Sequence, residues 1–328
     1  MYKSFYKLTR NPFEITPDPS FLFPTKAHNE ALAALYYGVR RHKGFVVMTG
    51  EVGTGKTLLV RCLLQLLNQN NLSYAYIFNS RLSPVEFLQY VAGDFGLSAQ
   101  GKNKSELLLE LSNFVISRHR QKLSTVLVVD EAHHVSAEVL EEIRLLTNLE
   151  TTQEKLLQIL LVGQPELDEK LDSVELRQLK QRIAFRCQLQ PLDPAETKGY
   201  VQRRLELAGA NSRAGVLFPS DTILEVYRHS RGIPRLINTI CENALITAYS
   251  RHAQSVTADM IKEIAADFRL GILHRSVIEG ASHDEDADAR RLAKTLLLLQ
   301  DYLRKVQSSH GEPRVAAVTG AMKHEPYI

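Results

Sequence analysis

The sequence predicts an α/β protein in which a parallel sheet is sandwiched by helices, followed by a small all-helical domain and a helical tail. A glycine-rich loop joins an apolar run to an amphipathic helix, and only helical patterns occur from 193 to 268. Apolar runs without alternation also indicate parallel strands that are buried on both faces. These runs, interleaved with helical stretches, are 45–49, 74–79, 125–130 and 156–162.

Helices are expected wherever apolar residues recur every three to four positions. The first of them covers 28–41 and precedes the first strand. The helices expected between and after the strands are 56–69, 83–95, 104–121, 137–149 and 164–180.

Composition narrows the class of protein. With 44% hydrophobic residues, the 328-residue chain is long enough for two domains with cores of their own. No apolar run approaches the ~20 residues of a membrane helix and no signal-peptide pattern opens the chain, so a cytoplasmic location is expected. Cys62, Cys187 and Cys241 are too far apart in sequence for a C-x-x-C metal site. The net charge of +3 does not by itself indicate a polyanionic partner, although a local basic patch is compatible with one.

The strongest motif is GEVGTGKT, which follows a predicted strand and opens a predicted helix. Glycines in such a loop let backbone N–H groups turn inward around phosphates, and the helix N-terminus adds positive potential. Lys56 is expected to reach the β- and γ-phosphates, and Thr57 to bind Mg²⁺. The expected cofactors are therefore ATP and Mg²⁺. The residues expected to bind them here are Gly50, Glu51, Val52, Gly53, Thr54, Gly55, Lys56, Thr57 and Leu58.

The run VLVVDE ends a buried strand in two carboxylates, which are costly there without a cation or a catalytic role. Asp130 is expected to hold Mg²⁺ and Glu131 to orient and polarise the attacking water. The alternative is that these acids merely favour the first turn of a helix. The letters DEAH also spell a helicase box, but the chain has no second helicase core. His133 and His134 are therefore interpreted as helix-start residues, with sensing of the γ-phosphate as the alternative.

Polar residues downstream complete the candidate site. Gln164 follows a predicted strand, so its amide is expected at the carboxyl edge of the sheet, where it can bond the γ-phosphate or the water. A plain helix-start residue is the alternative for Gln164. Arg177, Arg182 and Arg186 form either a solvated basic face or an arginine finger offered to a neighbouring subunit. Arg235, on the first turn of a later helix, is expected to reach back over the nucleotide.

The motifs GEVGTGKT, VLVVDE, VGQPEL, QRI and GIPR, in this order, resemble those of AAA+ ATPases. More narrowly, NPFEITPDPSFLFPT and HNEALAALYYGV resemble the general secretion pathway protein A group of ATPases. The resemblance implies that residues 28–32 lie near the adenine. It also implies Walker A at Lys56 and Thr57, Walker B at Asp130 and Glu131, sensor 1 at Gln164, sensor 2 at Arg235, and an arginine finger at Arg182 or, as second choice, Arg177.

Four regions follow from these patterns. Residues 1–26, rich in proline and aromatic residues, are expected to be an extended segment that docks on the body. Residues 27–191 are expected to form the AAA+ nucleotide-binding domain and 192–268 the helical lid. Residues 269–328 are expected to comprise a linker, an amphipathic helix and a disordered tail. The helix has a heptad-like stripe that packs on its own domain or docks on a partner, and its residues are Leu292, Leu296, Leu299, Leu303 and Val306.

Two functions of different classes are compatible with the resemblance. The favoured one is an oligomeric ATPase that acts as an assembly or regulatory factor on protein partners of a cell-envelope secretion or exopolysaccharide-export system. The alternative is a DNA-binding ATPase of the transposition target-selection type. The near-neutral charge and the lack of a recognisable DNA-reading motif favour the first, and Glu131 argues against a mere nucleotide switch. Secretion members of the group continue into a transmembrane helix and a peptidoglycan-binding domain, neither of which is expected in this sequence. A direct role in inserting a secretin through the cell wall is therefore not expected.

Overall fold

A computed structural model describes most of the chain. The predicted tail helix and the segments around it fall almost entirely outside the described residues, which end at Leu270. Along the part of the chain that the structure describes, no helix has both the length and the apolar character needed to cross a bilayer. The described ranges are 1–68, 72–78, 81–210 and 213–270.

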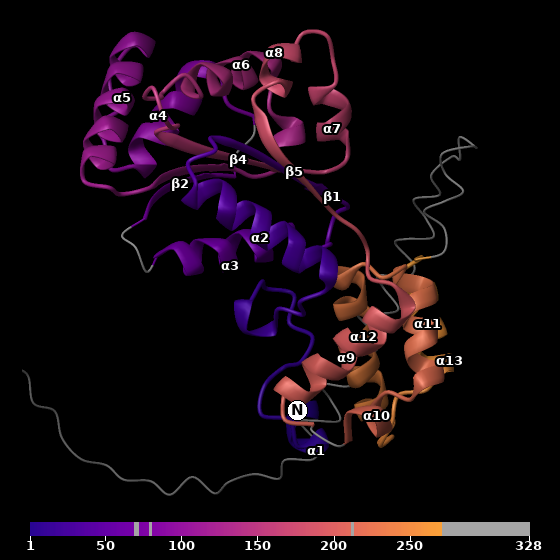
Figure 1. Cartoon of the computed structure of the whole chain (residues 1–328). Helices are drawn as coiled ribbons and strands as arrows, with labels where there is room; N and C mark the ends of the chain where they lie inside the picture. Colours follow the sequence, from indigo (N-terminus) through magenta and orange to yellow (C-terminus); the bar gives the residue numbers. More distant parts are fainter. Residues whose placement is uncertain (69–71, 79–80, 211–212, 271–328) are drawn as a thin grey trace, which may run out of the picture. The chain divides into compact units, whose positions relative to one another are not determined.

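Within these ranges, five parallel strands form one sheet in the order β2-β3-β4-β1-β5 (Figure 1). Every residue of β1, β3 and β4 is buried, because helices cover both faces of the sheet. This confirms the predicted parallel sheet. The strands are β1 (Phe45–Gly50), β2 (Ser73–Ile77), β3 (Thr125–Val129), β4 (Leu157–Gly163) and β5 (Ile183–Leu189).

The helices divide between the two faces of the sheet (Figure 1). One face packs against α2 (Lys26–Arg40) and α3 (Lys56–Asn68). The opposite face carries a larger layer made of α4 (Pro84–Asp94), α5 (Lys104–Arg120), α6 (Ala137–Leu146), α7 (Glu166–Leu171) and α8 (Arg177–Lys180).

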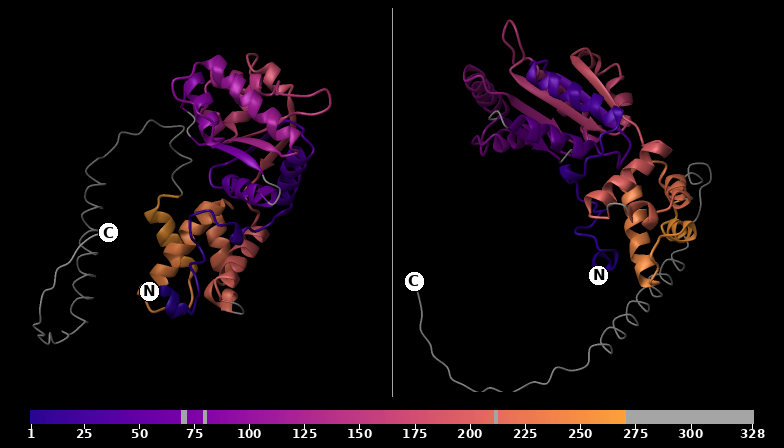
Figure 2. Two further views of the ribbon diagram at one scale, coloured as in Figure 1. Left: turned by 90° about the vertical axis from the view of Figure 1, so that its left-hand side faces the viewer. Right: turned by 60° about the horizontal axis from the view of Figure 1, so that its bottom comes forward.

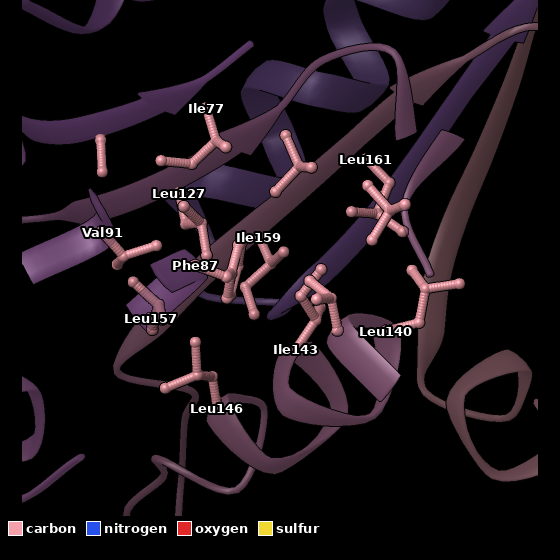
Figure 3. Close-up of a cluster of buried hydrophobic side chains, with 14 of the residues drawn as sticks. Ile77, Phe87, Val91, Leu127, Leu140, Ile143, Leu146, Leu157, Ile159 and Leu161 are labelled. Atoms are coloured by element: carbon pink, nitrogen blue, oxygen red, sulfur yellow. The ribbon is translucent and has the colours of Figure 1, made fainter. Parts of the chain in front are cut away.

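The core of the larger layer is apolar. Figure 3 shows Phe87 of α4 and Ile143 of α6 beside Leu127 and Ile159 of the sheet. All four side chains are at most 2% exposed. Burying each one removes water from apolar surface and stabilises the layer by about 1.5–3 kcal/mol. The helices on this face are thereby held at fixed positions behind the strand ends that carry the candidate site.

The last strand differs from the expectation. The sequence predicts one helix over 164–180 and no strand after it, whereas the chain forms α7, a break, α8 and then β5. β5 is an edge strand whose residues alternate between partly buried and exposed. Its run IAFRCQL therefore lacks the continuous apolar character of the central strands, and the prediction that relied on that character is wrong here.

Helices alone follow β5. They are α9 (Pro194–Leu207), α10 (Ala214–Leu217), α11 (Ser220–Ser230), α12 (Pro234–Ser250) and α13 (Ala258–Asp267). A capping box opens α9, where Asp193 accepts from the Glu196 N–H and the Glu196 side chain accepts from the Asp193 N–H. The core of this helical part is built largely from α9, α11, α12 and α13.

The N-terminal segment joins that same core. It is not wholly extended, because it contains α1 (Tyr2–Tyr6) and a short 3-10 helix, η1 (Pro19–Phe21). α1 lies beside α12 (Figure 2), and Phe13 is fully buried against Phe218. Aromatic side chains therefore hold the segment on the helical part.

Candidate functional site

The loop between β1 and α3 has the backbone that a phosphate cradle needs. Gly53 has φ +84° and Gly55 has φ +98°, a region that residues with side chains rarely adopt. A Cβ on Gly53 would also lie 2.7 Å from the Cβ of Arg235. Both glycines are therefore required by conformation, and Gly53 is required by space as well.

The side chain of Lys56 hydrogen-bonds the backbone of this loop. Its Nζ donates to the carbonyl of Gly50 at 2.7 Å and to that of Glu51 at 3.0 Å. Burial lowers the pKa of Lys56, while the carboxylates of Glu131 and Asp130 act in the opposite direction. The ammonium group thus lies beside the first turn of α3, where inward N–H groups and a cation together suit a phosphate.

A hydroxyl and a carboxylate from distant parts of the chain meet beside the lysine. Thr57 Oγ1 donates to Asp130 Oδ2 at 3.1 Å, and the Glu131 N–H donates to Asp130 Oδ1 at 2.9 Å. These hard oxygen donors fit Mg²⁺, which is commonly held by one or two protein groups together with substrate phosphates. In line with that, no group of three or more His, Cys, Asp or Glu side chains within the described ranges is placed to hold a metal by itself.

Glu131 has a strained backbone. Its φ of 51° and ψ of 37° are left-handed helical, which costs a residue with a side chain about 1–2 kcal/mol. The side chain is 46% exposed and therefore accessible to solvent. Gln164 Nε2 lies 3.4 Å from Glu131 Oε2. The carboxylate acts on Lys56, and Glu131 lines the cavity described below, and backbone strain of this kind is typical of functional positions.

His133 belongs to this group, although the sequence analysis treated it as a helix-start residue. Its Nε2 lies 3.0 Å from Gln164 Nε2, and its Nδ1 lies 3.6 Å from Glu131 Oε2. Burial and the neighbouring His134 lower the pKa of His133. The side chain is therefore neutral near pH 7, and one ring nitrogen is free to accept from the Gln164 amide.

A cavity of about 390 Å³ opens onto these groups. Arg235 lines it and donates its N–H to the carbonyl of Gly53 at 3.2 Å, so the helical part is hydrogen-bonded to the loop. The loop and sheet contribute Val52, Gly53, Gly55, Lys56, Thr57, Leu58 and Glu131. The other lining residues are Ile15, Thr16 and Pro17 of the N-terminal segment and Tyr200, Arg204, Pro234, Arg235 and Asn238 of the helical part.

Residues 28–32, expected near the adenine, do not line this cavity. His28 instead contacts the backbone of the phosphate loop. Thr25 Oγ1 lies 2.7 Å from His28 Nδ1, and the ring also hydrogen-bonds the backbone of Thr54. Burial lowers the pKa of His28. The segment that faces the cavity is Ile15–Pro17, which the sequence analysis missed because its residues carry no recognisable binding motif.

The three arginines near the domain edge differ in their partners. Arg182 hydrogen-bonds two residues at the C-terminal end of α6. Its Nη1 donates to Thr147 Oγ1 at 2.5 Å and also to Asn148 Oδ1. Arg186 forms ion pairs with Asp168 and Asp172. Arg177 is exposed and has no ion pair within the described residues. The structure therefore does not bring Arg182 to the cavity and leaves Arg177 accessible.

Tyr76 is a second residue that the sequence analysis missed. Its hydroxyl donates to Asp130 Oδ2 at 2.6 Å, and burial beside that carboxylate raises the pKa of Tyr76. Strand β2 carries this tyrosine next to β3. The order of the strands was needed to see the pair, because nothing in the run SYAYI indicates which strand lies beside it.

Comparison with known proteins agrees with this geometry. An AAA domain model matches residues 39–171. General secretion pathway protein A of Aeromonas hydrophila is 42% identical over 257 residues, which are 78% of this chain and 46% of that protein. The chain is an AAA+ protein related to general secretion pathway protein A. This confirms the resemblance that the motifs indicated, over less than half of the relative's length.

Other known proteins are also similar to this AAA+ chain, one in sequence and two in fold. The ATP-dependent target DNA activator B of Escherichia phage D108 is 25% identical over 234 residues, covering 70% of this chain and 68% of that protein. The Aeropyrum pernix ORC1 protein in complex with DNA superposes with a TM-score of 0.61 at 18% identity, covering 94% of this chain and 85% of that chain. The Thermotoga maritima RuvB Holliday junction branch migration motor superposes with a TM-score of 0.51 at 17% identity, covering 82% of this chain and of that chain.

Proposed function

We propose that this AAA+ protein binds and hydrolyses ATP with Mg²⁺, and that it works as a cytoplasmic oligomeric assembly or regulatory factor for a cell-envelope secretion or exopolysaccharide-export system. One observation carries the catalytic part. The phosphate loop with Thr57, Glu131 and Arg235 all line one cavity although they come from three separate parts of the sequence, and Thr57 is hydrogen-bonded to Asp130.

Each residue has a definite task in this proposal. Lys56 neutralises the β- and γ-phosphates, and Thr57 and Asp130 would hold Mg²⁺, which when bound offsets charge on the phosphate oxygens. Glu131 accepts a hydrogen bond from a water molecule and aligns it with the γ-phosphorus. As the water oxygen bonds to the γ-phosphorus, the bond from that phosphorus to the β–γ bridging oxygen breaks, and the water gives up one proton, which the Glu131 carboxylate accepts and passes to solvent. The products are ADP and inorganic phosphate.

Three further groups would hold the reacting atoms in place. Gln164 donates from its amide toward the water or the γ-phosphate, and neutral His133 fixes the orientation of that amide. Arg235 adds positive charge from the helical part. Because its backbone is bonded to Gly53, movement of the helical part and binding of the phosphates are expected to be coupled.

The proposed oligomer needs a finger from a neighbouring subunit, and Arg177 suits that role better than Arg182. The side chain of an arginine finger must extend into the active site of a neighbouring subunit. The Arg182 side chain instead hydrogen-bonds the C-terminal end of α6 in its own subunit. An arginine finger contributes about 10³-fold or more to turnover. Activity per subunit is therefore expected to rise with protein concentration in the wild type and to stay low and flat in Arg177→Ala.

The process served is inferred from similarity. The relative named for general secretion is far more similar to this chain than the phage DNA activator is, which favours an envelope export system and protein partners. The similarity to the ATP-dependent target DNA activator still supports DNA binding as the second candidate. Duplex binding that weakens steeply with salt, as expected when phosphate counterions are released, would favour that alternative.

Binding and hydrolysis measured side by side test the catalytic proposal. Lys56→Ala is expected to lose affinity for a fluorescent ATP analogue, whereas Glu131→Gln is expected to keep the affinity and release no phosphate. Glu169→Gln makes the same chemical change at an exposed position of α7 and serves as the matched control. Equal turnover in Glu131→Gln and Glu169→Gln would refute the assignment of Glu131.

A further inference from the structure

The hydroxyl of Tyr76 forms a short contact in the candidate site. It donates to Asp130 Oδ2 at 2.6 Å, and the same oxygen accepts from Thr57 Oγ1 at 3.1 Å. The other carboxylate oxygen, Oδ1, accepts from the Glu131 N–H at 2.9 Å. Both oxygens of a side chain that is only 7% exposed are therefore held by protein donors.

The sheet fixes where this tyrosine lies. β2 and β3 pair in parallel with Tyr76 opposite Val128, and the Asp130 N–H donates to the Ile77 carbonyl at 2.8 Å. On its other edge, the Tyr76 N–H donates to Asp94 Oδ2 at 2.5 Å. The tyrosine backbone is thus held between β3 and the end of α4. A tyrosine hydroxyl has an ordinary pKa of about 10, so it is protonated and able to donate at neutral pH.

We propose that Tyr76 is a positioning residue that sets the orientation of the Asp130 carboxylate and thereby the affinity of the site for Mg²⁺. The inference rests on the proposed function. A carboxylate offers about four lone-pair sites, and the donors described here occupy three of them. These three hydrogen bonds therefore fix the orientation of the Asp130 carboxylate before a metal binds to it. Hydrogen-bond partners of this kind commonly change metal affinity about 10–100-fold when they are removed.

Two tyrosines on one strand provide a matched test. Tyr76→Phe removes only the hydroxyl that touches Asp130. Tyr74→Phe makes the same change two residues away on the same face of β2, at a side chain that is 43% exposed. Binding of a fluorescent ATP analogue is titrated with Mg²⁺ at fixed nucleotide, and repeated in EDTA without metal.

For Tyr76→Phe, we expect the Mg²⁺ concentration at half-saturation to rise about 10-fold, with unchanged affinity in EDTA. Tyr74→Phe should match the wild type in both titrations. An unchanged or lowered half-saturation in Tyr76→Phe, an equal rise in Tyr74→Phe, or an equal loss of affinity in EDTA would each overturn the proposal.

Two further measurements distinguish a loss of Mg²⁺ affinity from misfolding of the variant and from failure of the proposed function. The melting temperature without metal tests whether Tyr76→Phe folds. If it does not fold, Tyr76→Leu, which also removes the hydroxyl donor, is titrated in its place, and a half-saturation at or below the wild-type value then overturns the proposal. If the wild type itself shows no Mg²⁺-dependent binding, the proposed function fails. If the wild type binds and Tyr76→Phe is identical to it, only the role of Tyr76 fails.

Discussion

His28 and His133 each place a neutral imidazole against a different side of the site. His28 bonds Thr25 and the backbone of Thr54 behind the phosphate loop, and His133 bonds Gln164 at the sheet edge. Burial lowers the pKa of both. Protonating either ring adds a buried charge beside a site that already holds the Lys56 ammonium. The state of these two rings therefore links the stability of the loop to pH.

The free energy of unfolding is expected to fall at acidic pH because of these two histidines. An unfolded histidine has a pKa of about 6.5, and both folded values are lower. Below pH 6.5 the unfolded chain therefore binds more protons, and the free energy of unfolding falls as the pH drops through the folded pKa. One proton corresponds to at most about 1.4 kcal/mol per pH unit.

Urea denaturation at pH 7.5, 6.5 and 5.5 checks this prediction. His28→Asn is expected to lose part of the wild-type decrease in stability below pH 6.5, while His133 keeps the remainder. The exposed His252 provides the control, because His252→Asn should keep the full wild-type slope. A slope in His28→Asn that equals the wild-type slope would contradict the account.

Helix α4 shows how one backbone angle reverses the effect of a substitution. Gly93 lies inside the helix and Gly96 lies just beyond its C-cap, where φ is +79°. A Cβ at either glycine would meet no atom within 4 Å. Conformation alone therefore separates the two positions.

We expect Gly93→Ala to raise the free energy of unfolding by about 0.5–1 kcal/mol, because alanine loses less backbone entropy in a helix. Gly96→Ala is expected to lower it by about 1–2 kcal/mol, because the left-handed conformation strains a residue with a Cβ. Urea denaturation of the two variants and the wild type in one buffer measures both changes in the free energy of unfolding. Effects of the same sign would rule out this explanation.

The elements that a single sequence predicts well are those with a strong period or a complete motif. β1, β3 and β4 are predicted because most of their residues are apolar and do not alternate with polar ones, and α3 because the loop GEVGTGKT precedes it. β5 was missed because an edge strand needs only one buried side and alternates weakly. Its identification required the pairing with β1, which joins residues far apart in the sequence.

The candidate site divides in the same way. Lys56, Thr57, Asp130 and Glu131 stand in motifs whose chemistry is local, and in the structure these residues lie beside one another. Tyr76 and the cavity-lining segment 15–17 act through contacts between distant elements, which no local pattern encodes. The choice of Arg182 as the finger came from resemblance and stays a prediction, and the bonds of Arg182 to the end of α6 could not be seen in the sequence.

The N-terminal segment connects the helical part to the edge of the cavity. Arg204 of α9 donates to the carbonyls of Pro12 and Glu14, and Arg61 of α3 donates to the carbonyl of Pro17. The same segment buries Phe13 in the helical core. Stability of the helical part and access to the cavity are therefore expected to depend on one short stretch of chain.

Two neighbouring substitutions separate these roles. Phe13→Ala empties a fully buried site and is expected to lower the free energy of unfolding by about 3–5 kcal/mol. Ile15 is 56% exposed and lines the cavity, so Ile15→Ala should change stability by no more than about 0.5 kcal/mol while weakening nucleotide binding. Urea denaturation measures the free energy of unfolding of both variants, and titration with a fluorescent ATP analogue measures their nucleotide affinity. Unchanged nucleotide affinity in Ile15→Ala would remove the segment from the site.

The measurement that tests the central claim most directly is a crystal structure of Glu131→Gln with ATP and Mg²⁺, because this variant is expected to bind without hydrolysing. We predict the triphosphate in the loop from Gly50 to Thr57, the metal on Thr57 and Asp130, and Arg235 beside the phosphates. A nucleotide bound elsewhere, or a metal without contact to Thr57 and Asp130, would contradict the account.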